Sequence, residues 1–277
     1  MSYLRIVTLT SLAMIAFAGN SVLCRLALKY TSIDAVSFTT IRLISGAVVL
    51  WLVVQIRHGK HTGAGNWLSA FALFVYAAGF SYSYINLPAA TGALLLFGAV
   101  QATMIGYGVF VGERLLKLQI AGLILAFGGL VGLLLPGLSA PPLFSSLLML
   151  GAGVAWGIYS LRGKDSNEPI RITAGNFLRA APIAAILSVF MFNSATLDTN
   201  GILYAVLSGA LTSGMGYAIW YTVLPALKAT NAATVQLSVP VITALGGIVF
   251  LGEPISLRLV LASVAIIGGI ALVIVDK

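Results

Sequence analysis

Two arginines lie inside long apolar stretches of the sequence, at Arg42 and Arg179. Each is about eight residues from the start of its stretch, which corresponds to roughly 12 Å along a helix. A cation at that depth in hydrocarbon is costly unless it finds acceptors or reaches the surface. Since a guanidinium matches the two oxygens of a carboxylate, either arginine could bind an amino-acid substrate. Alternatively, both bind carbonyls at helix ends and stabilise the fold, which their matching positions in the sequence favour.

Aromatic residues form a second group of candidates, because their rings can stack on an aromatic substrate while their polar ends bind its polar groups. Tyr76 and Phe80 share a helix face at i, i+4 spacing, as do Tyr217 and Tyr221. Rings near the ends of spans, such as Tyr84, would instead belong to the aromatic belt at the membrane surface. The aromatic candidates for lining a site are Tyr76, Phe80, Trp156, Tyr159, Tyr217 and Trp220.

Uncharged polar residues at hydrocarbon depth must face a partner helix or water. Gln236 lies four residues before Pro240, and a proline inside a helix removes a backbone donor and can leave that carbonyl unpaired. The pattern predicts a kinked binding element or hinge at Pro240. The polar candidates are Asn20, Gln101, Asn176, Gln236 and Ser238.

The seven acidic residues all lie at the ends of apolar stretches or between them. Carriers of organic cations usually need a buried carboxylate, so the sequence favours substrates without net positive charge. A membrane-embedded enzyme would need a cluster of His, Asp or Glu or a Ser–Lys pair in the bilayer, and the sequence has neither. Cys24 is the only cysteine, and His58 and His61 have no partner set for a metal. We expect no cofactor and no metal.

The elements that must position these residues are membrane-spanning helices. Of the 277 residues, 60% are hydrophobic and 8% are charged, against about 25% charged in a soluble domain. Apolar runs of about twenty residues recur, each long enough to cross roughly 30 Å of hydrocarbon as a helix. The runs do not alternate as barrel strands do, so an all-α membrane protein is predicted. We expect ten spans, at residues 4–24, 34–56, 66–86, 90–112, 117–135, 142–161, 171–192, 199–223, 229–251 and 256–275.

The formal net charge of +8 reflects orientation in the lipid bilayer rather than a nucleic-acid partner, because cytoplasmic loops are rich in cations. With the amino terminus inside, ten cations are assigned to the cytoplasmic side and at most three to the outer side. Both termini are therefore expected in the cytoplasm, with the protein in a bacterial inner membrane; the oligomeric state stays open. The cytoplasmic group is Arg5, Arg57, Lys60, Arg114, Lys117, Arg162, Lys164, Arg171, Arg258 and Lys277, and the outer group is Arg25, Lys29 and Lys228.

The sequence contains one pattern twice. Residues 90–135 recur as residues 230–275, most clearly at a Gly-Glu corner that ends in Glu113 and in Glu253. Each half, residues 1–136 and 137–277, then holds five spans, and an odd number inverts the second half relative to the first. We place both glutamates on the cytoplasmic side, where each either binds the first amides of the next span or pairs across the two-fold axis to close a gate.

Five-plus-five spans, the corners Phe110-Val-Gly-Glu113 and Phe250-Leu-Gly-Glu253, and a glycine pair in the last span of each half resemble the EamA-type drug/metabolite transporter superfamily. Within it, the general likeness is to the YddG-type aromatic amino-acid exporters. The resemblance implies a substrate cavity lined by spans 1–4 and 6–9. We expect a secondary transporter that exports small zwitterionic metabolites, above all aromatic and other neutral amino acids, by alternating access around a midplane cavity. The alternative is a broad-specificity drug or organic-cation efflux carrier.

Overall fold

The computed structural model describes residues 1–58, 64–112, 114–137, 140–163, 168–227 and 235–275, and the regular elements within them are all helical. Eight helices are long and apolar enough to cross a membrane, and the helix Ser238–Leu251 is apolar but shorter. The prediction of an all-α membrane protein is therefore confirmed. Ten spans stay a prediction, because the tyrosines and serines of the helix Trp67–Tyr84 lower its hydropathy and it is not among the eight.

The helices begin and end close to the predicted limits. In the first half they are α1 Tyr3–Tyr30, α2 Ala35–His58, α3 Trp67–Tyr84, α4 Ala89–Phe110 and α5 Lys117–Leu134. In the second half they are α6 Leu143–Gly163, α7 Pro169–Phe190, α8 Thr199–Leu207, α9 Gly216–Val223, α11 Ser238–Leu251 and α12 Leu257–Val275. The largest difference in the first half is α1, which continues six residues beyond the predicted end at residue 24 and so includes Arg25.

The predicted span 199–223 is not one α-helix. Between α8 and α9 the chain forms a π-helix over Ser208–Met215, which we call the π segment. At its end the N–H of Gly216 bonds to the carbonyl of Leu211, five residues back. π-Helical turns are rare in proteins, and many of those that do occur lie at functional sites.

Side chains that accept from free N–H groups mark where several helices start. Asn66 accepts from the N–H of Ser69 at the start of α3, and Asp198 accepts from Gly201 at the start of α8. Asp34 accepts from the first turn of α2 and also from the N–H of Thr196. Burial acts to raise the pKa of Asp34, but these donors outweigh it and hold the pKa below its ordinary value.

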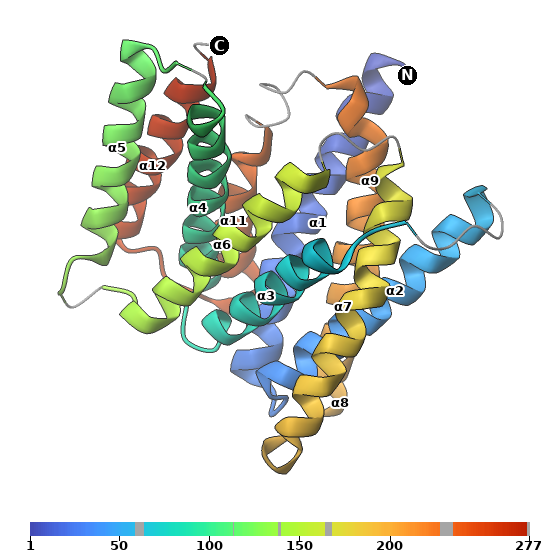
Figure 1. Cartoon of the computed structure of the whole chain (residues 1–277). Coiled ribbons are helices and arrows are strands. Elements are labelled where there is room, and N and C mark those ends of the chain that lie inside the picture. The colour runs from blue at the N-terminus through green and yellow to red at the C-terminus, as the bar shows by residue number, and fades with distance from the viewer. Residues whose placement is uncertain (59–63, 113, 138–139, 164–167, 228–234, 276–277) are drawn as a thin grey trace.

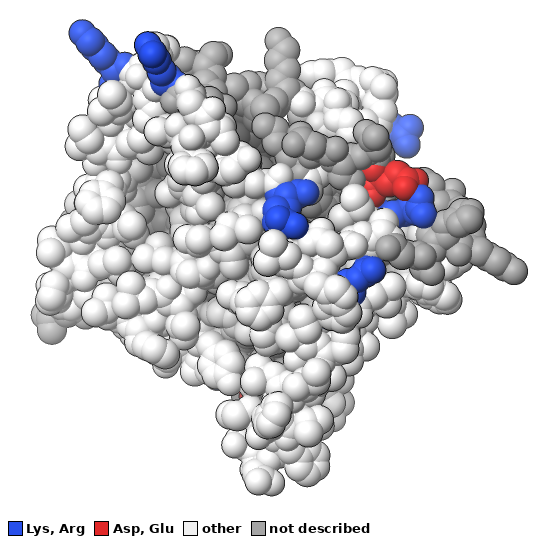
Figure 2. Space-filling model, in the orientation of Figure 1, with Lys and Arg blue, Asp and Glu red and all other residues white. Residues whose placement is uncertain are grey.

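Two groups of helices make up the molecule (Figure 1). At one edge α5 lies against α12, where a Cβ at Gly122 would come within 2.5 Å of the Gly269 carbonyl oxygen, so glycine permits the close contact. The other helices pack around α1, α2 and α3, and α4 joins the two groups through α6, α11 and α12. Lys and Arg gather on the upper part of the face in Figure 2, whereas its lower tip is white.

Candidate functional site

Arg42 lies near the centre of the bundle and is only 1% exposed. Its Nε donates to the hydroxyl of Ser213 at 3.2 Å, and its Nη2 donates to the hydroxyl of Tyr76 at 3.0 Å. The guanidinium also lies over the rings of Tyr76 and Phe80, 5.2 and 4.9 Å from their centroids. Its Nη1 is buried without a partner among the described residues. A buried donor left unpaired is costly, so this group is a candidate for binding an anion.

Aromatic rings from several helices form a cluster that includes Tyr76, one of the two rings against this arginine. Trp156 of α6 has its ring centroid 4.8 Å from that of Tyr76 in α3 and 5.0 Å from that of Tyr217 in α9. Trp156 is also stacked on Tyr159, at 5.3 Å and 27°. Phe17 of α1 meets Tyr217 edge to face at 5.7 Å. The cluster can therefore hold a flat ring by stacking and edge contacts.

Asn20 of α1 adds an amide to the same cluster. Its Oδ1 accepts from the hydroxyls of Ser208 and Thr212 in the π segment, at 2.6 and 3.2 Å. Its Nδ2 donates to the hydroxyl of Tyr76 at 3.3 Å, so Tyr76 joins Asn20 to Arg42. We call Asn20, Arg42 and the rings of Phe17, Tyr76, Phe80, Trp156 and Tyr217 the central site. The hydroxyls of the π segment bind its polar groups from one side.

The central site is closed in this structure. The space inside it has a volume of about 20 Å³, which is room for about one water molecule. An amino acid fits only after helices move apart. The residues that line this space are Phe17, Asn20, Ser21, Tyr76, Phe80, Leu96, Phe97, Trp156, Thr212 and Tyr217.

Arg179 has different surroundings from Arg42, although their sequence positions correspond. Its Nη1 donates to the carbonyls of Ala64 and Gly175 at 3.1 and 2.9 Å. These contacts hold the segment that precedes α3 against α7. They support the interpretation that this arginine stabilises the fold. Asn176 acts nearby, where its Oδ1 accepts from the N–H of Asn66 at 2.9 Å.

Other predicted residues lie outside the central site. Gln101 is buried, and its Nε2 has no partner among the described residues, but it does not line the central space. Trp220 reaches the site only through Phe17, with 6.0 Å between ring centroids. Gln236 and Ser238 lie at a break before α11.

The break that Pro240 predicts is present, although it comes earlier than expected. Leu237 is a turn and α11 begins at Ser238, so Pro240 lies in the first helical turn. An N–H there has no partner within the helix in any case, so this proline costs little. Its role as a hinge stays a prediction.

Glu253 and Arg25 form a buried pair at one end of the molecule. The Nε of Arg25 donates to Glu253 at 2.9 Å, and its Nη1 donates to the carbonyls of Tyr84 and Ile85, both at 2.8 Å. The second carboxylate oxygen of Glu253 accepts from the N–H of Ala89 at 2.7 Å. The pair joins α1, the end of α3, the start of α4 and the corner after α11.

These contacts correct two predictions. Glu253 binds the first amide of α4 rather than the amides of the following helix α12, so the predicted cap on α12 is wrong, and its role in closing a gate stays a prediction. It also cannot face the cytoplasm while Arg25 faces outward, because the two side chains touch. Arg258 was misplaced as well: it bonds to the carbonyl of Leu135, at the opposite end of α5 from the cytoplasmic cation Lys117. Counting nine spans from an inner amino terminus places this corner outside. Glu113, like Lys60, Lys164, Lys228 and Lys277, lies outside the described residues.

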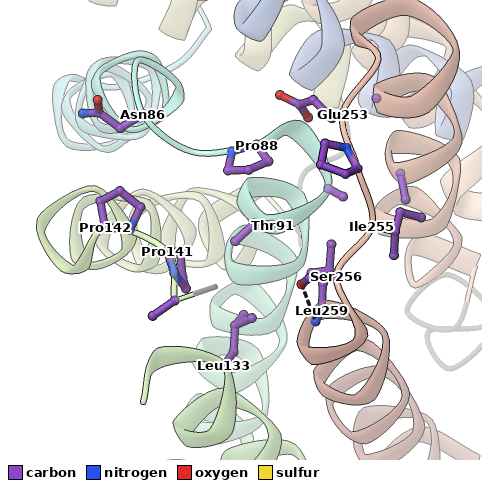
Figure 3. Close-up of a pocket in the computed structure, with 15 residues that line it drawn as sticks. Asn86, Pro88, Thr91, Leu133, Pro141, Pro142, Glu253, Ile255, Ser256 and Leu259 are labelled. Atoms are coloured by element: carbon purple, nitrogen blue, oxygen red, sulfur yellow. Dashed lines mark hydrogen bonds between the residues drawn. The ribbon is translucent and has the colours of Figure 1, made fainter. Parts of the chain in front are cut away.

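A larger cavity, of about 270 Å³, lies beside this corner between α4, α5 and α12. Figure 3 shows Glu253 and Pro88 at one side of it, with Thr91 and Leu133 along its length. Its walls are mainly proline and aliphatic side chains, and Arg25 and Ala89 already bind the oxygens of Glu253. The central site therefore offers more groups for a polar substrate.

Sequence analysis missed the π-segment hydroxyls of Ser208, Thr212 and Ser213, and the burial of Arg25. Small polar residues beside Gly209 and Gly214 were the available signal for the π segment, because they gather in the middle of an apolar run. Arg25 was missed because the apolar run was taken to end at Cys24.

A model of the EamA-like transporter family matches the chain at residues 4–135 and again at residues 143–275. The chain belongs to the EamA-like transporter family. Its family consists of transporters rather than enzymes, and its helices make it an integral membrane protein.

Relatives of this EamA-like transporter include proteins named for amino-acid export. It is 55% identical to an uncharacterized protein of Pseudomonas aeruginosa, over 99% of this chain and 96% of that one. It is 28% identical to a probable terminal-alkyne amino-acid exporter of Streptantibioticus cattleyicolor, over 72% and 69% of the two chains. It is 31% identical to the threonine/homoserine exporter RhtA of Salmonella typhimurium, over 45% and 43%. A solved crystal structure with 20% identity shares its fold, with a TM-score of 0.67 over 96% of this chain and 99% of that one.

Proposed function

We propose that this EamA-like transporter exports small zwitterionic amino acids, above all aromatic and other neutral ones, as a secondary carrier that works by alternating access. The observation that carries this proposal is Arg42, a buried guanidinium that lies over the rings of Tyr76 and Phe80 at one side of the aromatic cluster. The residues that line the space beside it include no Asp or Glu. The central site therefore carries a fixed positive charge that a substrate carboxylate can neutralise.

Each part of an aromatic amino acid has a partner in the central site. The carboxylate pairs with Arg42, since charge-assisted bonds to a guanidinium are short and strong. The ammonium group faces the Oδ1 of Asn20 and the faces of the rings. The side chain stacks against Trp156 and Tyr217. Threonine and homoserine, which RhtA is named for exporting, share this head group and differ only in the part that meets the rings.

The arrangement favours an amino acid over an organic cation. Aromatic cages do bind cations. Here, however, Arg42 lies over two of the rings, and its positive charge would repel a cationic substrate. Among the described acidic residues only Glu253 is buried, and it is paired with Arg25 at one end of the molecule. Drug or organic-cation efflux is therefore the less supported function.

We propose further that residues 1–136 and 137–277 are inverted repeats of five spans each. The family model matches each half separately, which supports a duplication. Contacts also recur between corresponding helices. The third helix of each half packs on the first helix of the other half: α3 packs on α6, and α8 and α9 pack on α1. The fourth helix of each half does the same, since α4 packs on α6 and α11 packs on α1. Gly112 and Gly252 both have positive φ, 101° and 61°, in the two corners. The corner at Gly112 follows the end of α4, whereas the corner at Gly252 meets the start of α4 through Glu253. The two corners therefore lie at opposite ends of this helix, as inversion requires.

The test of substrate is transport by the purified protein in liposomes. Vesicles preloaded with unlabelled phenylalanine should accumulate labelled phenylalanine and threonine. They should not accumulate phenethylamine, which lacks the carboxylate, or a dicationic dye. Transport of the dye without any amino acid would overturn the assignment.

A further inference from the structure

The two hydroxyls that bind Arg42 lie on one edge of its guanidinium. Nε and Nη2 form the side-on fork that pairs with both oxygens of a carboxylate in bidentate ion pairs. In this closed site the acceptors on that fork are the hydroxyl of Ser213 at 3.2 Å and the hydroxyl of Tyr76 at 3.0 Å. These two oxygens come from different helices, and together they present the guanidinium with the pattern of a carboxylate.

We propose that the hydroxyls of Ser213 and Tyr76 take the places of the substrate carboxylate oxygens whenever the carrier is empty. The proposal rests on the proposed function, because it needs a substrate with a carboxylate. Both distances exceed the roughly 2.7–2.9 Å that is usual between a guanidinium and a carboxylate. A substrate therefore displaces two weaker neutral bonds and forms two stronger ones.

The consequence concerns the return of the empty carrier. To pass from one side to the other, the empty protein must close around Arg42 without a substrate. A buried guanidinium with several unmet donors would make that state costly, and Nη1 is already without a partner among the described residues. Because Ser213 and Tyr76 satisfy Nε and Nη2, the empty carrier can close and reorient. It can then carry out net export rather than obligatory exchange of one substrate for another.

The π segment explains how Ser213 can serve as such a placeholder. Its hydroxyls of Ser208, Thr212 and Ser213 all contact the interior, the first two at Asn20 and the third at Arg42. Thr212 and Ser213 are adjacent, so the wide turn directs two consecutive side chains into one site. Gly214 follows directly, where a Cβ would come within 3.2 Å of Val49, so glycine lets this wide turn lie close to α2. A change of the wide turn to an ordinary α turn would move the hydroxyl of Ser213 away from Arg42.

The test compares two kinds of transport by Ser213→Ala in liposomes. Exchange of labelled for unlabelled phenylalanine needs only the loaded carrier, so its rate should stay within about twofold of the unsubstituted protein. Net efflux into phenylalanine-free buffer needs the empty carrier to return, so its rate should fall about tenfold, because one more buried donor loses its partner. Purified Ser213→Ala should also bind phenylalanine more tightly, since the substrate no longer competes with a hydroxyl.

The matched control is Ser83→Ala, which removes an equally buried hydroxyl whose described bond is to the carbonyl of Gly79 in its own helix. Its exchange and net efflux should both match those of the unsubstituted protein. If Ser213→Ala slows exchange and net efflux in equal proportion, or changes neither, the placeholder role is wrong while amino-acid transport stands. If the unsubstituted protein moves no carboxylate-bearing substrate, both proposals fail together.

Discussion

Arg42 and Arg179 show that corresponding positions in the two halves of the sequence need not have the same surroundings. Both were predicted from the sequence because a cation eight residues into an apolar run is conspicuous. Their surroundings were not predictable, because the acceptors come from distant parts of the chain: Ser213 for Arg42 and Ala64 for Arg179. An arginine bonded to carbonyls stabilises the fold, whereas one bonded to two movable hydroxyls can exchange them for a ligand.

We therefore expect different results from the same substitution at the two sites. Arg42→Lys keeps the charge but loses the fork, and phenylalanine transport in liposomes should fall at least tenfold while the protein remains folded. Arg179→Lys should retain transport within about threefold but lower the melting temperature in detergent, because it loses bonds to Ala64 and Gly175. Equal losses of transport in both variants would contradict the distinction between them.

At the scale of elements, apolar run length was a good guide to the helices and a poor guide to their internal geometry. The limits of α2 to α7 lie within about two residues of the predicted ones, because the hydrocarbon thickness fixes how long an apolar run must be. The π segment was not predictable in this way, because an apolar run can form either i→i−4 or i→i−5 backbone hydrogen bonds and its length does not distinguish them. Ser213 was missed for that reason: its direction depends on the register of the turn.

Deleting one residue from the π segment should test what its geometry does. Leu211 is 49% exposed, so its removal leaves no hole in the core. The shorter segment can form ordinary α turns, which removes the wide turn that directs both Thr212 and Ser213 into the site. We expect helix content by circular dichroism to stay unchanged and phenylalanine transport to fall at least tenfold. Leu211→Ala, which keeps the length, should transport normally. Full transport by the deletion variant would show that the π geometry is dispensable.

At the scale of the whole molecule, the buried Arg25–Glu253 pair holds one end closed. Burial of this pair could not be predicted, because its members are 228 residues apart and Glu253 also caps a third element, α4. In the proposed alternating-access cycle, opening of this end would separate α1 from the corner after α11.

Breaking the pair should open that end, and Cys24 can report it. Cys24 is the only cysteine in the chain, is fully buried and precedes Arg25. Removing one partner of a buried ion pair costs about 3–5 kcal/mol, so Glu253→Gln should destabilise the closed end. An impermeant maleimide added to intact cells should then label Cys24 at least tenfold faster. Glu168→Gln, at an exposed ion pair with Arg171, should leave the rate unchanged. Unchanged labelling in Glu253→Gln would mean that other contacts keep this end closed.

The inverted arrangement itself can be tested at the two Gly-Glu corners. Leu116 follows one corner and Ile255 follows the other, and both side chains are exposed, at 54% and 44%. In a Cys24→Ser background, an impermeant thiol reagent should label Ile255→Cys in intact cells but Leu116→Cys only after the membrane is permeabilised. The two corners lie at opposite ends of α4, whose 22 residues span about 33 Å, so one face of the membrane cannot hold both. Labelling of both from the same side would mean that α4 does not cross the bilayer, and the inverted repeat and the midplane site would fall with it.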